Sequence, residues 1–215
     1  MAMLLSLVFA VGVTVLPPEQ VLQRVKSTYA TDVTGSFSQV FVNKMRGKQR
    51  VETGQLWAKK DGRVRWSYLS PVRKDFIYDG KTAYFYEPQN AQVTVFDRFD
   101  DSPLASAVRF LWGQGNITEA FDVKPCTGTN CDRGEAGDIV LELWPKQEIP
   151  TVRYTLLVVD PASFRVRRSI VFDPLGNRNE YHFTELKFGS KIADSKFDFE
   201  IPKGASILRS TMTTD

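Results

Sequence analysis

Histidine and cysteine are scarce in this chain, and their scarcity narrows the chemistry that it can perform. The 215 residues include one histidine and two cysteines. A Ser-His-Asp triad needs a histidine held against a nucleophile, whereas His182 alternates within the strand-like stretch EYHFTEL. The sequence also lacks a G-x-S-x-G motif and a glycine-rich phosphate-binding loop followed by a helix. Its acidic residues lie mostly in turns, which does not favour glycoside hydrolysis. By elimination we expect a binding protein that is not an enzyme and has no cofactor.

A concentrated run of one charge is missing as well. The chain has 28 basic and 25 acidic residues, a net charge of +3, and the basic residues are scattered through the expected strands. Binding to a phosphate backbone relies on a concentrated basic footprint. We therefore expect no nucleic-acid partner, and we interpret most of the basic residues as parts of solvated strand faces.

The first sixteen residues, MAMLLSLVFAVGVTVL, carry no charge and are followed by the polar stretch PPEQ. This run is shorter than the roughly 20 residues of a membrane span and has the length of a signal-peptide apolar region. It lacks a preceding Lys or Arg and a small-x-small cleavage site. We expect residues 1–16 to be an atypical signal peptide and residues 17–215 to form a single domain, with a buried N-terminal strand or helix as the alternative. No cysteine lies near the end of the run, so we do not expect a lipid-anchored form.

The two cysteines, Cys126 and Cys131, enclose TGTN in a glycine-rich polar loop. A tetrahedral zinc site needs four ligands, which two cysteines and one distant histidine do not supply without unusual carboxylate help. A disulfide is the better interpretation, and it agrees with an oxidising compartment. We predict one disulfide that acts as a local staple, and no metal.

A two-residue periodicity dominates the chain from Phe37 onward. In GQLWAKKDGRVRWSYLSP, Gly54 to Pro71, two alternating runs flank a turn and predict a β-hairpin. One face of this hairpin carries Leu56, Ala58, Val64, Trp66 and Tyr68. Similar runs recur up to FDFEI near the end of the chain, and they predict an α+β fold with about eleven antiparallel strands in one strongly curved sheet. Incomplete curling would leave an apolar concave face that helices must cover.

Two segments show helical spacing. The first begins at Pro18 and has one apolar side, formed by Val21, Leu22, Val25 and Tyr29. In the second, Ser102 is the expected N-cap, Pro103 is the first helical residue, and Gly113 ends the helix. Its apolar side consists of Leu104, Ala107, Val108 and Leu111. Either helix could be an ordinary core helix, or the two could cover the concave face of the sheet.

Several motifs follow one another along the chain, namely GSFSQ, GQLWAKKDGRVRWSYLSP, YDGKTAYFYEPQNAQVTV, SPLASAVRFLWG and FDFEIPKGASIL. In this order they resemble the LolA family of periplasmic carriers of outer-membrane lipoproteins. The resemblance extends from about Pro17 to Leu208, and its specificity lies in the order and spacing of the motifs.

The resemblance implies an unclosed antiparallel β-barrel with a helical lid over an apolar cavity that takes the acyl chains of a lipoprotein. It also implies a periplasmic monomer that is loaded by an inner-membrane ABC transporter and delivers its cargo to an outer-membrane receptor. A lid-latching arginine of the family matches Lys60, and the proline after it matches Asp61. Lys60 follows Leu56 and Ala58 in the alternation, but an ammonium lacks the five-donor fork of a guanidinium. An apolar residue at the cavity mouth, involved in transporter contact, matches Val64.

A carrier of this kind must hide hydrocarbon from water. Exposing one acyl chain of about 15 methylenes would cost about 12 kcal/mol. Aromatic side chains would shield it broadly without demanding one chain geometry. The residues that we expect to contact acyl chains are Leu22, Val25, Leu56, Ala58, Val64, Trp66, Tyr68, Leu104, Val108 and Leu111.

Several alternatives stay open. An outer-membrane receptor of the same fold would need a cysteine at the end of the leader, and the lipid-sensing half of a periplasmic stress regulator would be joined to a further domain. Another periplasmic lipid-binding protein of the same fold, an exported hydrolase and a structural cell-envelope protein are the remaining hypotheses.

Overall fold

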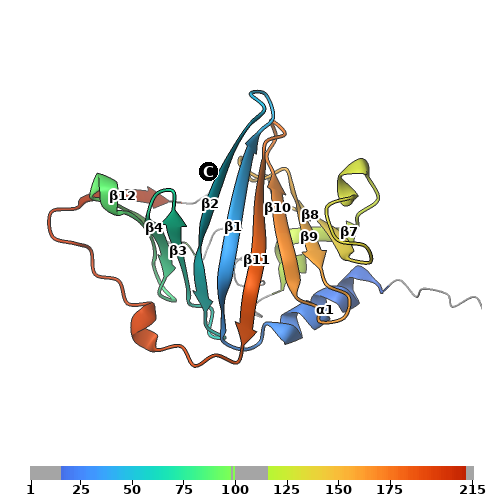
Figure 1. Ribbon diagram of the computed structural model, residues 1–215, viewed down its shortest axis with the longest axis horizontal. Helices are drawn as coiled ribbons and strands as arrows, with labels where there is room; N and C mark the ends of the chain where they lie inside the picture. Colours follow the sequence, from blue (N-terminus) through green and yellow to red (C-terminus); the bar gives the residue numbers. More distant parts are fainter. Residues whose placement is uncertain (1–15, 98, 100–115, 212–215) are drawn as a thin grey trace, which may run out of the picture.

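One sheet organises the residues that the computed structural model describes, which are 16–97, 99 and 116–211 (Figure 1). Its first six strands are β1 (Val33–Asn43), β2 (Lys48–Ala58), β3 (Val64–Ser70), β4 (Lys74–Tyr78), β5 (Ala83–Glu87) and β6 (Gln92–Asp97). The others are β7 (Phe121–Pro125), β8 (Ile139–Pro145), β9 (Tyr154–Val159), β10 (Val166–Phe172), β11 (Arg178–Phe188) and β12 (Ser206–Thr211). The helical elements of this part of the chain are α1 (Pro18–Thr28), α3 (Ile117–Ala120) and the 3₁₀ turns η1 (Pro88–Asn90), η3 (Thr129–Cys131) and η4 (Asp194–Lys196).

None of the helices within the described ranges is long and apolar enough to cross a membrane. Two expectations fall outside these ranges. They are the leader, apart from Leu16, and the second helix with Leu104, Val108 and Leu111.

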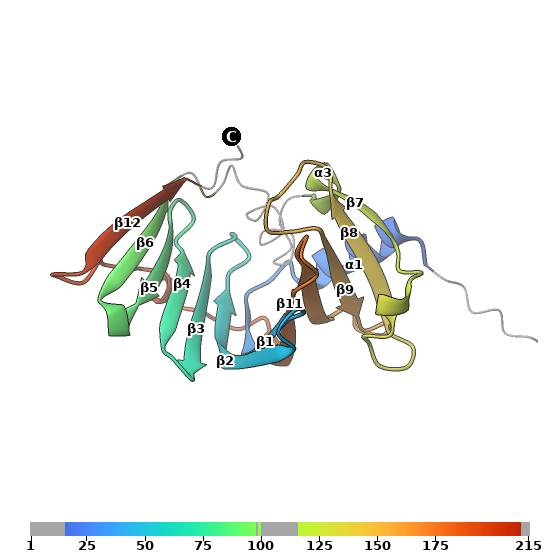
Figure 2. The ribbon, with the colours of Figure 1, turned by 90° about the horizontal axis from the view of Figure 1, so that it is seen from above.

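The sheet is strongly curved and does not close. Its strand order is β12-β6-β5-β4-β3-β2-β1-β11-β10-β9-β8-β7, so β12 and β7 are its two edges. In Figure 2 these two strands stand at opposite ends of the curve. Neighbouring strands are antiparallel, except that β12 runs parallel to β6. The predicted unclosed and strongly curved sheet is confirmed. It has twelve strands in the described residues where about eleven antiparallel strands were expected, and β12 is parallel to its neighbour.

The prediction that FDFEI forms the last strand is wrong. Residues 197–201 contain no strand, and the final strand is β12, which begins at Ser206. Phe197 is buried, and the ring of Phe199 packs on Tyr84 and Tyr86 at centroid distances of 5.1 and 5.6 Å. A segment that crosses a sheet can bury alternate residues in the same way as a strand within it, so periodicity alone does not separate the two.

The predicted hairpin is confirmed and consists of β2 and β3. Leu56 lies opposite Trp66, and Ala58 lies opposite Val64, so these four side chains share one face of the sheet. Leu56, Ala58 and Val64 are buried in the main hydrophobic core, and Trp66 packs against that core while partly exposed. We call this side of the sheet the inner face.

The predicted helix at Pro18 is confirmed as α1, and it packs in the same core. Its buried residues are Val21, Leu22 and Val25. They belong to one cluster with Leu157 and Val159 of β9. Just after the helix, the buried Tyr29 hydroxyl accepts a hydrogen bond from the backbone N–H of Val166 at 3.0 Å. The helix therefore covers the half of the sheet that contains β9 and β10.

The opposite, outer face is covered on β2 to β6 by residues 189–205, which we call the C-terminal strap. Figure 1 shows the strap running from the end of β11, past the lower ends of the neighbouring strands, to β12. Arg65 Nη1 donates to the backbone oxygen of Lys196 at 3.2 Å, and Asp194 accepts hydrogen bonds from Lys59 and Arg63. These two bases lower the pKa of Asp194, which therefore stays ionised and holds the strap to the β2–β3 turn.

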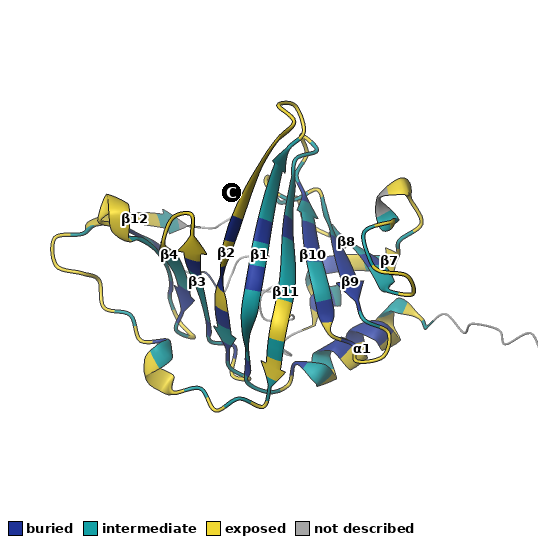
Figure 3. Cartoon of the chain, viewed as in Figure 1, coloured by how far each residue is buried: buried dark blue, intermediate teal, exposed yellow. Residues whose placement is uncertain are grey.

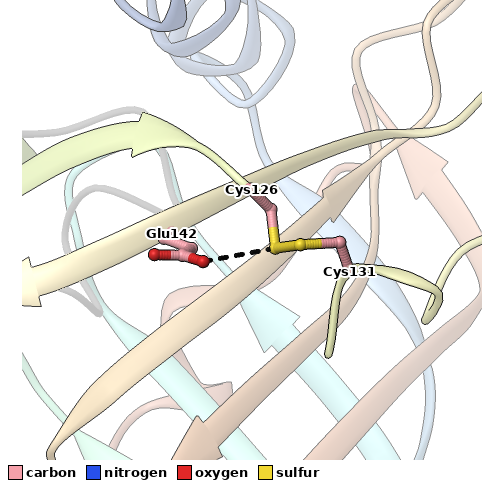
Figure 4. A group of neighbouring side chains, drawn as sticks. All are labelled: Cys126, Cys131 and Glu142. Carbon is pink, nitrogen blue, oxygen red and sulfur yellow. Dashed lines mark hydrogen bonds between the residues drawn. A yellow bond between two sulfur atoms is a disulfide. The ribbon is translucent and has the colours of Figure 1, made fainter. Parts of the chain in front are cut away.

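A second outer region is covered by the loop that carries the two cysteines. Cys126 and Cys131 form the predicted disulfide (Figure 4). The outer-face side chains below this loop form their own cluster of Leu156, Val158, Ile170 and Phe172. Arg168 Nη1 fastens the loop by donating to the backbone oxygen of Arg133 at 2.8 Å. Glu142 lies beside the cysteines, but both sulfurs are in the disulfide and neither is a thiolate that could bind zinc.

We expect the double variant Cys126→Ser, Cys131→Ser to fold with a free energy of unfolding about 2 kcal/mol lower than that of the wild type. The reason is that the short disulfide-closed loop restricts the unfolded chain. Urea denaturation measures the change. Thiol titration of the denatured, unreduced wild type should find no free thiol, and two titratable thiols would contradict the disulfide.

Tyr29→Phe should lower the free energy of unfolding by about 1–3 kcal/mol, because the buried N–H of Val166 loses its acceptor. Tyr84→Phe is the matched control, since the Tyr84 ring packs on Phe199 and its hydroxyl makes no hydrogen bond among the described residues. Equal stability of the two variants in urea denaturation would show that the Tyr29 hydroxyl does not fasten α1 to the sheet.

Candidate functional site

The inner face brings together most of the residues that the sequence analysis assigned to acyl-chain contact. The members of that set within the described residues are Leu22, Val25, Leu56, Ala58, Val64, Trp66 and Tyr68. All of them lie in or against the main hydrophobic core. The other three, Leu104, Val108 and Leu111, lie outside the described residues. The inner face is therefore one continuous apolar surface between strands of both halves of the sheet.

An aromatic cluster occupies the middle of this face. The ring of Trp66 lies 4.9 Å from Phe37, 5.3 Å from Tyr181 and 5.9 Å from Phe183, measured between centroids. The ring of Phe37 also meets Tyr68 edge-on at 4.9 Å. These residues come from β1, β3 and β11, so the cluster crosses the junction between the two halves.

Glycine at position 54 makes room for this cluster. Gly54 lies opposite Phe37 on β1 and opposite Tyr68 on β3. A Cβ atom at this position would lie 2.7 Å from the ring of Phe37 and 2.2 Å from the backbone oxygen of Ser67. A larger residue would force the Phe37 ring and β3 away, so the close packing depends on the missing side chain.

The sequence analysis missed several aromatic residues of the inner face. Phe76 and Tyr78 of β4 both pack against Phe99, at centroid distances of 5.7 and 5.2 Å. The alternation of β4 could have indicated that Phe76 and Tyr78 share a face. Phe37 and Phe183 gave no such signal, because only the long-range pairing of β1 with β11 places them opposite each other.

Beyond the aromatic cluster the inner face becomes polar. We call the side chains of Gln39, Glu52, Lys74, Asn179 and Tyr181 the polar belt. Lys74 Nζ donates to both carboxylate oxygens of Glu52, at 2.8 and 2.9 Å, although Glu52 is only 5% exposed. Gln39 Nε2 donates to Asn179 Oδ1 at 2.8 Å, and Asn179 Nδ2 donates to the Tyr181 hydroxyl at 3.2 Å. A buried charge is costly without its partner, so Glu52 and Lys74 must stay paired. The belt therefore marks a sharp end to the apolar surface.

The hydroxyl of Tyr181 in the belt and that of Tyr68 beside it are neutral. Burial raises the pKa of Tyr68 and of Tyr181 above the usual value of a phenol, so both hydroxyls keep their protons. Lys74 also lies over the ring of Tyr68, 4.4 Å from its centroid. The belt thus offers hydroxyl and amide groups as well as a neutralised ion pair.

Lys60 lies at the opposite end of β2 from the belt. The alternation would place it on the inner face, but β2 ends at Ala58 and Lys60 is an exposed residue of the β2–β3 turn. Its backbone N–H donates to Asp32 Oδ1 at 3.0 Å. In the same turn, Asp61 accepts hydrogen bonds from the backbone and the side chain of Arg63. Asp61 therefore orders the turn through these contacts.

Comparison with known proteins identifies the family. The family model of the outer membrane lipoprotein carrier protein LolA matches residues 28–200. An outer-membrane lipoprotein carrier protein of Pseudomonas syringae pv. tomato is 28% identical over 181 residues, which cover 82% of this chain and 81% of that protein. Another, of Pseudomonas putida (strain GB-1), is 26% identical over 216 residues and covers 96% of this chain and 97% of that protein.

Solved structures share the fold at lower identity. An uncharacterized conserved protein from Thermus thermophilus aligns with a TM-score of 0.57 at 13% identity, over 89% of this chain and 98% of that chain. A LolA superfamily protein from Nitrosomonas europaea aligns with a TM-score of 0.50 at 13% identity, over 86% of this chain and 99% of that chain. The family match covers most of the chain, as the resemblance of its motifs implied. This chain belongs to the LolA family of outer-membrane lipoprotein carrier proteins.

Proposed function

We propose that this protein is a periplasmic carrier that binds the acyl chains of lipoproteins released from the inner membrane and delivers them to an outer-membrane receptor. The observation that carries the proposal is the apolar inner face of an unclosed sheet, in a chain that belongs to a family of carriers. The family is one of carrier proteins and not of enzymes, which agrees with the small number of candidate catalytic groups in the sequence.

In this proposal an acyl chain lies on the inner face and replaces contacts within the protein with contacts of its own. The aromatic cluster around Trp66 provides broad apolar contact, and α1 covers the neighbouring half of the sheet through Leu22 and Val25. The polar belt limits how far hydrocarbon can extend. An apolar ligand against Glu52 and Lys74 would exclude water from these groups and could not form hydrogen bonds with them. The polar groups that join the acyl chains of the cargo to its polypeptide are better suited to lie against the polar belt.

Loading and delivery require the inner face to open. Val64 is fully buried, so a transporter could contact this position only after the elements over it have moved. Opening would expose apolar surface to water unless a membrane partner or the cargo covers it. The inner-membrane ABC transporter and the outer-membrane receptor are the partners that we propose for these two steps.

Lys60 is our candidate for a latch between the closed and open forms. An ammonium at the β2–β3 turn could donate to backbone oxygens at a helix end in the closed form, where the helix dipole favours a cation. Because these contacts would exist only in the closed form, they would shift the balance between binding and release.

Trp66→Glu should reduce capture of an acylated lipoprotein by at least about tenfold, because a carboxylate without a partner is costly against hydrocarbon. Trp57→Glu is the matched control, since Trp57 belongs to the same hairpin but faces outward. The measurement is the yield of carrier–lipoprotein complex after loading, with mass spectrometry of the bound acylated peptide.

Circular dichroism must show that both variants keep the fold. If the folded Trp66→Glu variant captures as much cargo as Trp57→Glu, the inner face is not the binding surface. If no acylated molecule is ever recovered with the wild type, the carrier function itself is contradicted.

Lys60→Leu should bind cargo at least as tightly as the wild type and transfer it to the purified receptor several-fold more slowly, because the closed empty form loses contacts that favour release. Lys60→Arg should keep transfer, since a guanidinium makes at least as many hydrogen bonds. Lys81→Leu, in the β4–β5 turn at the same end of the sheet, controls for the loss of a cation. Transfer by Lys60→Leu at the wild-type rate would show that Lys60 is an ordinary turn residue.

A further inference from the structure

Two hairpins end side by side at one end of the sheet, as Figure 1 shows for β1–β2 and β10–β11. The ladder between β1 and β11 continues up to Val42, which lies opposite Arg178. Beyond it, the backbone N–H of Lys44 donates to Asn177 Oδ1 at 3.0 Å and joins the two turns. We call residues 43–48 and 173–178 the paired tips.

Each tip presents one aliphatic side chain to solvent. Met45 is 91% exposed and Leu175 is 77% exposed, and the next most exposed large apolar residue among those described is only 49% exposed. Figure 3 shows the β1–β2 tip as an exposed projection. The turns that hold these residues are ordered, because Arg46 N–H donates to Asn43 Oδ1 at 2.7 Å and Asn177 N–H donates to Asp173 Oδ1 at 2.8 Å. The two most exposed aliphatic residues of the described chain thus occur on adjacent, ordered turns.

The same tips are basic. Lys44, Arg46 and Lys48 are exposed, and none of them forms an ion pair among the described residues. The opposite end of the sheet is different, because Arg63 in the β2–β3 turn pairs with Asp61 and Asp194. Within the paired tips, Arg178 pairs with Glu180, so the cations left without an ion-pair partner among the described residues of the tips are Lys44, Arg46 and Lys48.

A basic hollow of about 250 Å³ lies beside the paired tips. Its cationic lining consists of Lys44, Arg133, Arg153 and Arg178. Its aromatic lining consists of Tyr154 and Phe172, whose rings stack at a centroid distance of 4.6 Å. The one acidic residue in the lining, Asp173, accepts hydrogen bonds from Asn177. Arg133 and Arg178 also pair with Glu180, whereas Lys44 and Arg153 form no ion pair among the described residues. A phosphate group in this hollow would therefore meet the ammonium of Lys44 and the guanidinium of Arg153 first.

We propose that the paired tips dock the protein on an anionic phospholipid bilayer. Met45 and Leu175 enter the apolar boundary of the bilayer, Lys44, Arg46 and Lys48 remain at the level of the headgroups, and the basic hollow receives a headgroup phosphate. A bilayer fits better than an acidic protein, because the aliphatic residues stand on projecting turns and a protein partner would need a matching apolar pocket for each. Cations behind a projecting apolar residue are the usual arrangement of a bilayer surface contact. The proposal goes beyond the carrier function and does not depend on it.

The first experiment measures sedimentation of the protein with phosphatidylcholine vesicles, with and without added phosphatidylglycerol, in the absence of any lipoprotein. We expect binding only to the vesicles that contain phosphatidylglycerol, and weaker binding as salt is raised. The triple variant Lys44→Gln, Arg46→Gln, Lys48→Gln should bind these vesicles roughly a hundredfold more weakly. The triple variant Lys81→Gln, Lys191→Gln, Lys203→Gln is the matched control, because it loses the same charge from exposed positions elsewhere and should bind almost as the wild type does.

The second experiment separates the apolar contribution from the charge. Met45→Ser combined with Leu175→Ser should weaken binding to the anionic vesicles by about tenfold without a change in charge. Ile207→Ser combined with Leu208→Ser, at exposed residues of β12, is the control and should have little effect. All variants carry the same N-terminus as the wild type, so any difference between them comes from the substituted positions.

Three outcomes would overturn the proposal. The first is that the wild type does not bind anionic vesicles, and the second is that the tip variants and their controls bind equally. The third is tip-dependent binding to an acidic polypeptide without binding to vesicles, which would assign the surface to a protein partner. None of these results bears on acyl-chain capture, which is measured separately.

Discussion

The ladder between β1 and β11 joins the two halves of the sheet, and the other features of the molecule depend on it. Strand β1 comes from the beginning of the described sheet and β11 from near its end, yet they pair from Val33 opposite Phe188 to Val42 opposite Arg178. On one side lie β2 to β6 and β12, and on the other lie β7 to β10. Three features follow along this ladder in order: the aromatic cluster, the polar belt and the paired tips. Each combines residues that are distant in the sequence and become neighbours only through this pairing.

The two faces of the sheet are covered in different ways. On the outer face the covering elements belong to the chain itself, namely the C-terminal strap over β2 to β6 and the disulfide-closed loop over β8 to β10. On the inner face α1 covers one half. In the aromatic cluster Phe37 and Tyr68 are buried, whereas Trp66, Tyr181 and Phe183 are only partly buried among the described residues. A sheet that is firmly covered outside can keep its curvature when its inner contacts are exchanged for those of a ligand. This division suits a carrier, because the scaffold need not come apart when cargo enters.

Polarity changes along the ladder in a way that links the two proposals. The end near Val33 and Leu56 is apolar, the middle holds the aromatic cluster, and the next layer holds the buried pair of Glu52 and Lys74. Beyond it stand the basic tips with Met45 and Leu175. If the tips rest on a bilayer, the polar belt lies between the lipid surface and the apolar inner face. The belt would then separate the surface that touches lipid from the surface that holds hydrocarbon, so the protein could approach a membrane without exposing its inner face.

The sequence by itself determined the local parts of this structure. Alternation placed Leu56, Ala58, Val64 and Trp66 on one face, because side chains in a strand point alternately and a short turn leaves few registers. The 3.6-residue period identified α1, and the spacing of two cysteines in a polar loop indicated the disulfide. The motif order indicated the family and with it an unclosed sheet.

Only the tertiary structure decided which distant strands meet, because alternation is the same whether a strand pairs with its neighbour in the sequence or with one far along the chain. It therefore decided that Phe37 and Phe183 share the cluster with Trp66, and that FDFEI crosses the sheet as a strap. It also decided that β2 ends before Lys60, because turn geometry fixes where a ladder stops. The basic residues looked scattered in the sequence, and the tertiary structure gathers Lys44, Arg153 and Arg178 around one hollow, since charge density is set by distance in space and not by separation along the chain.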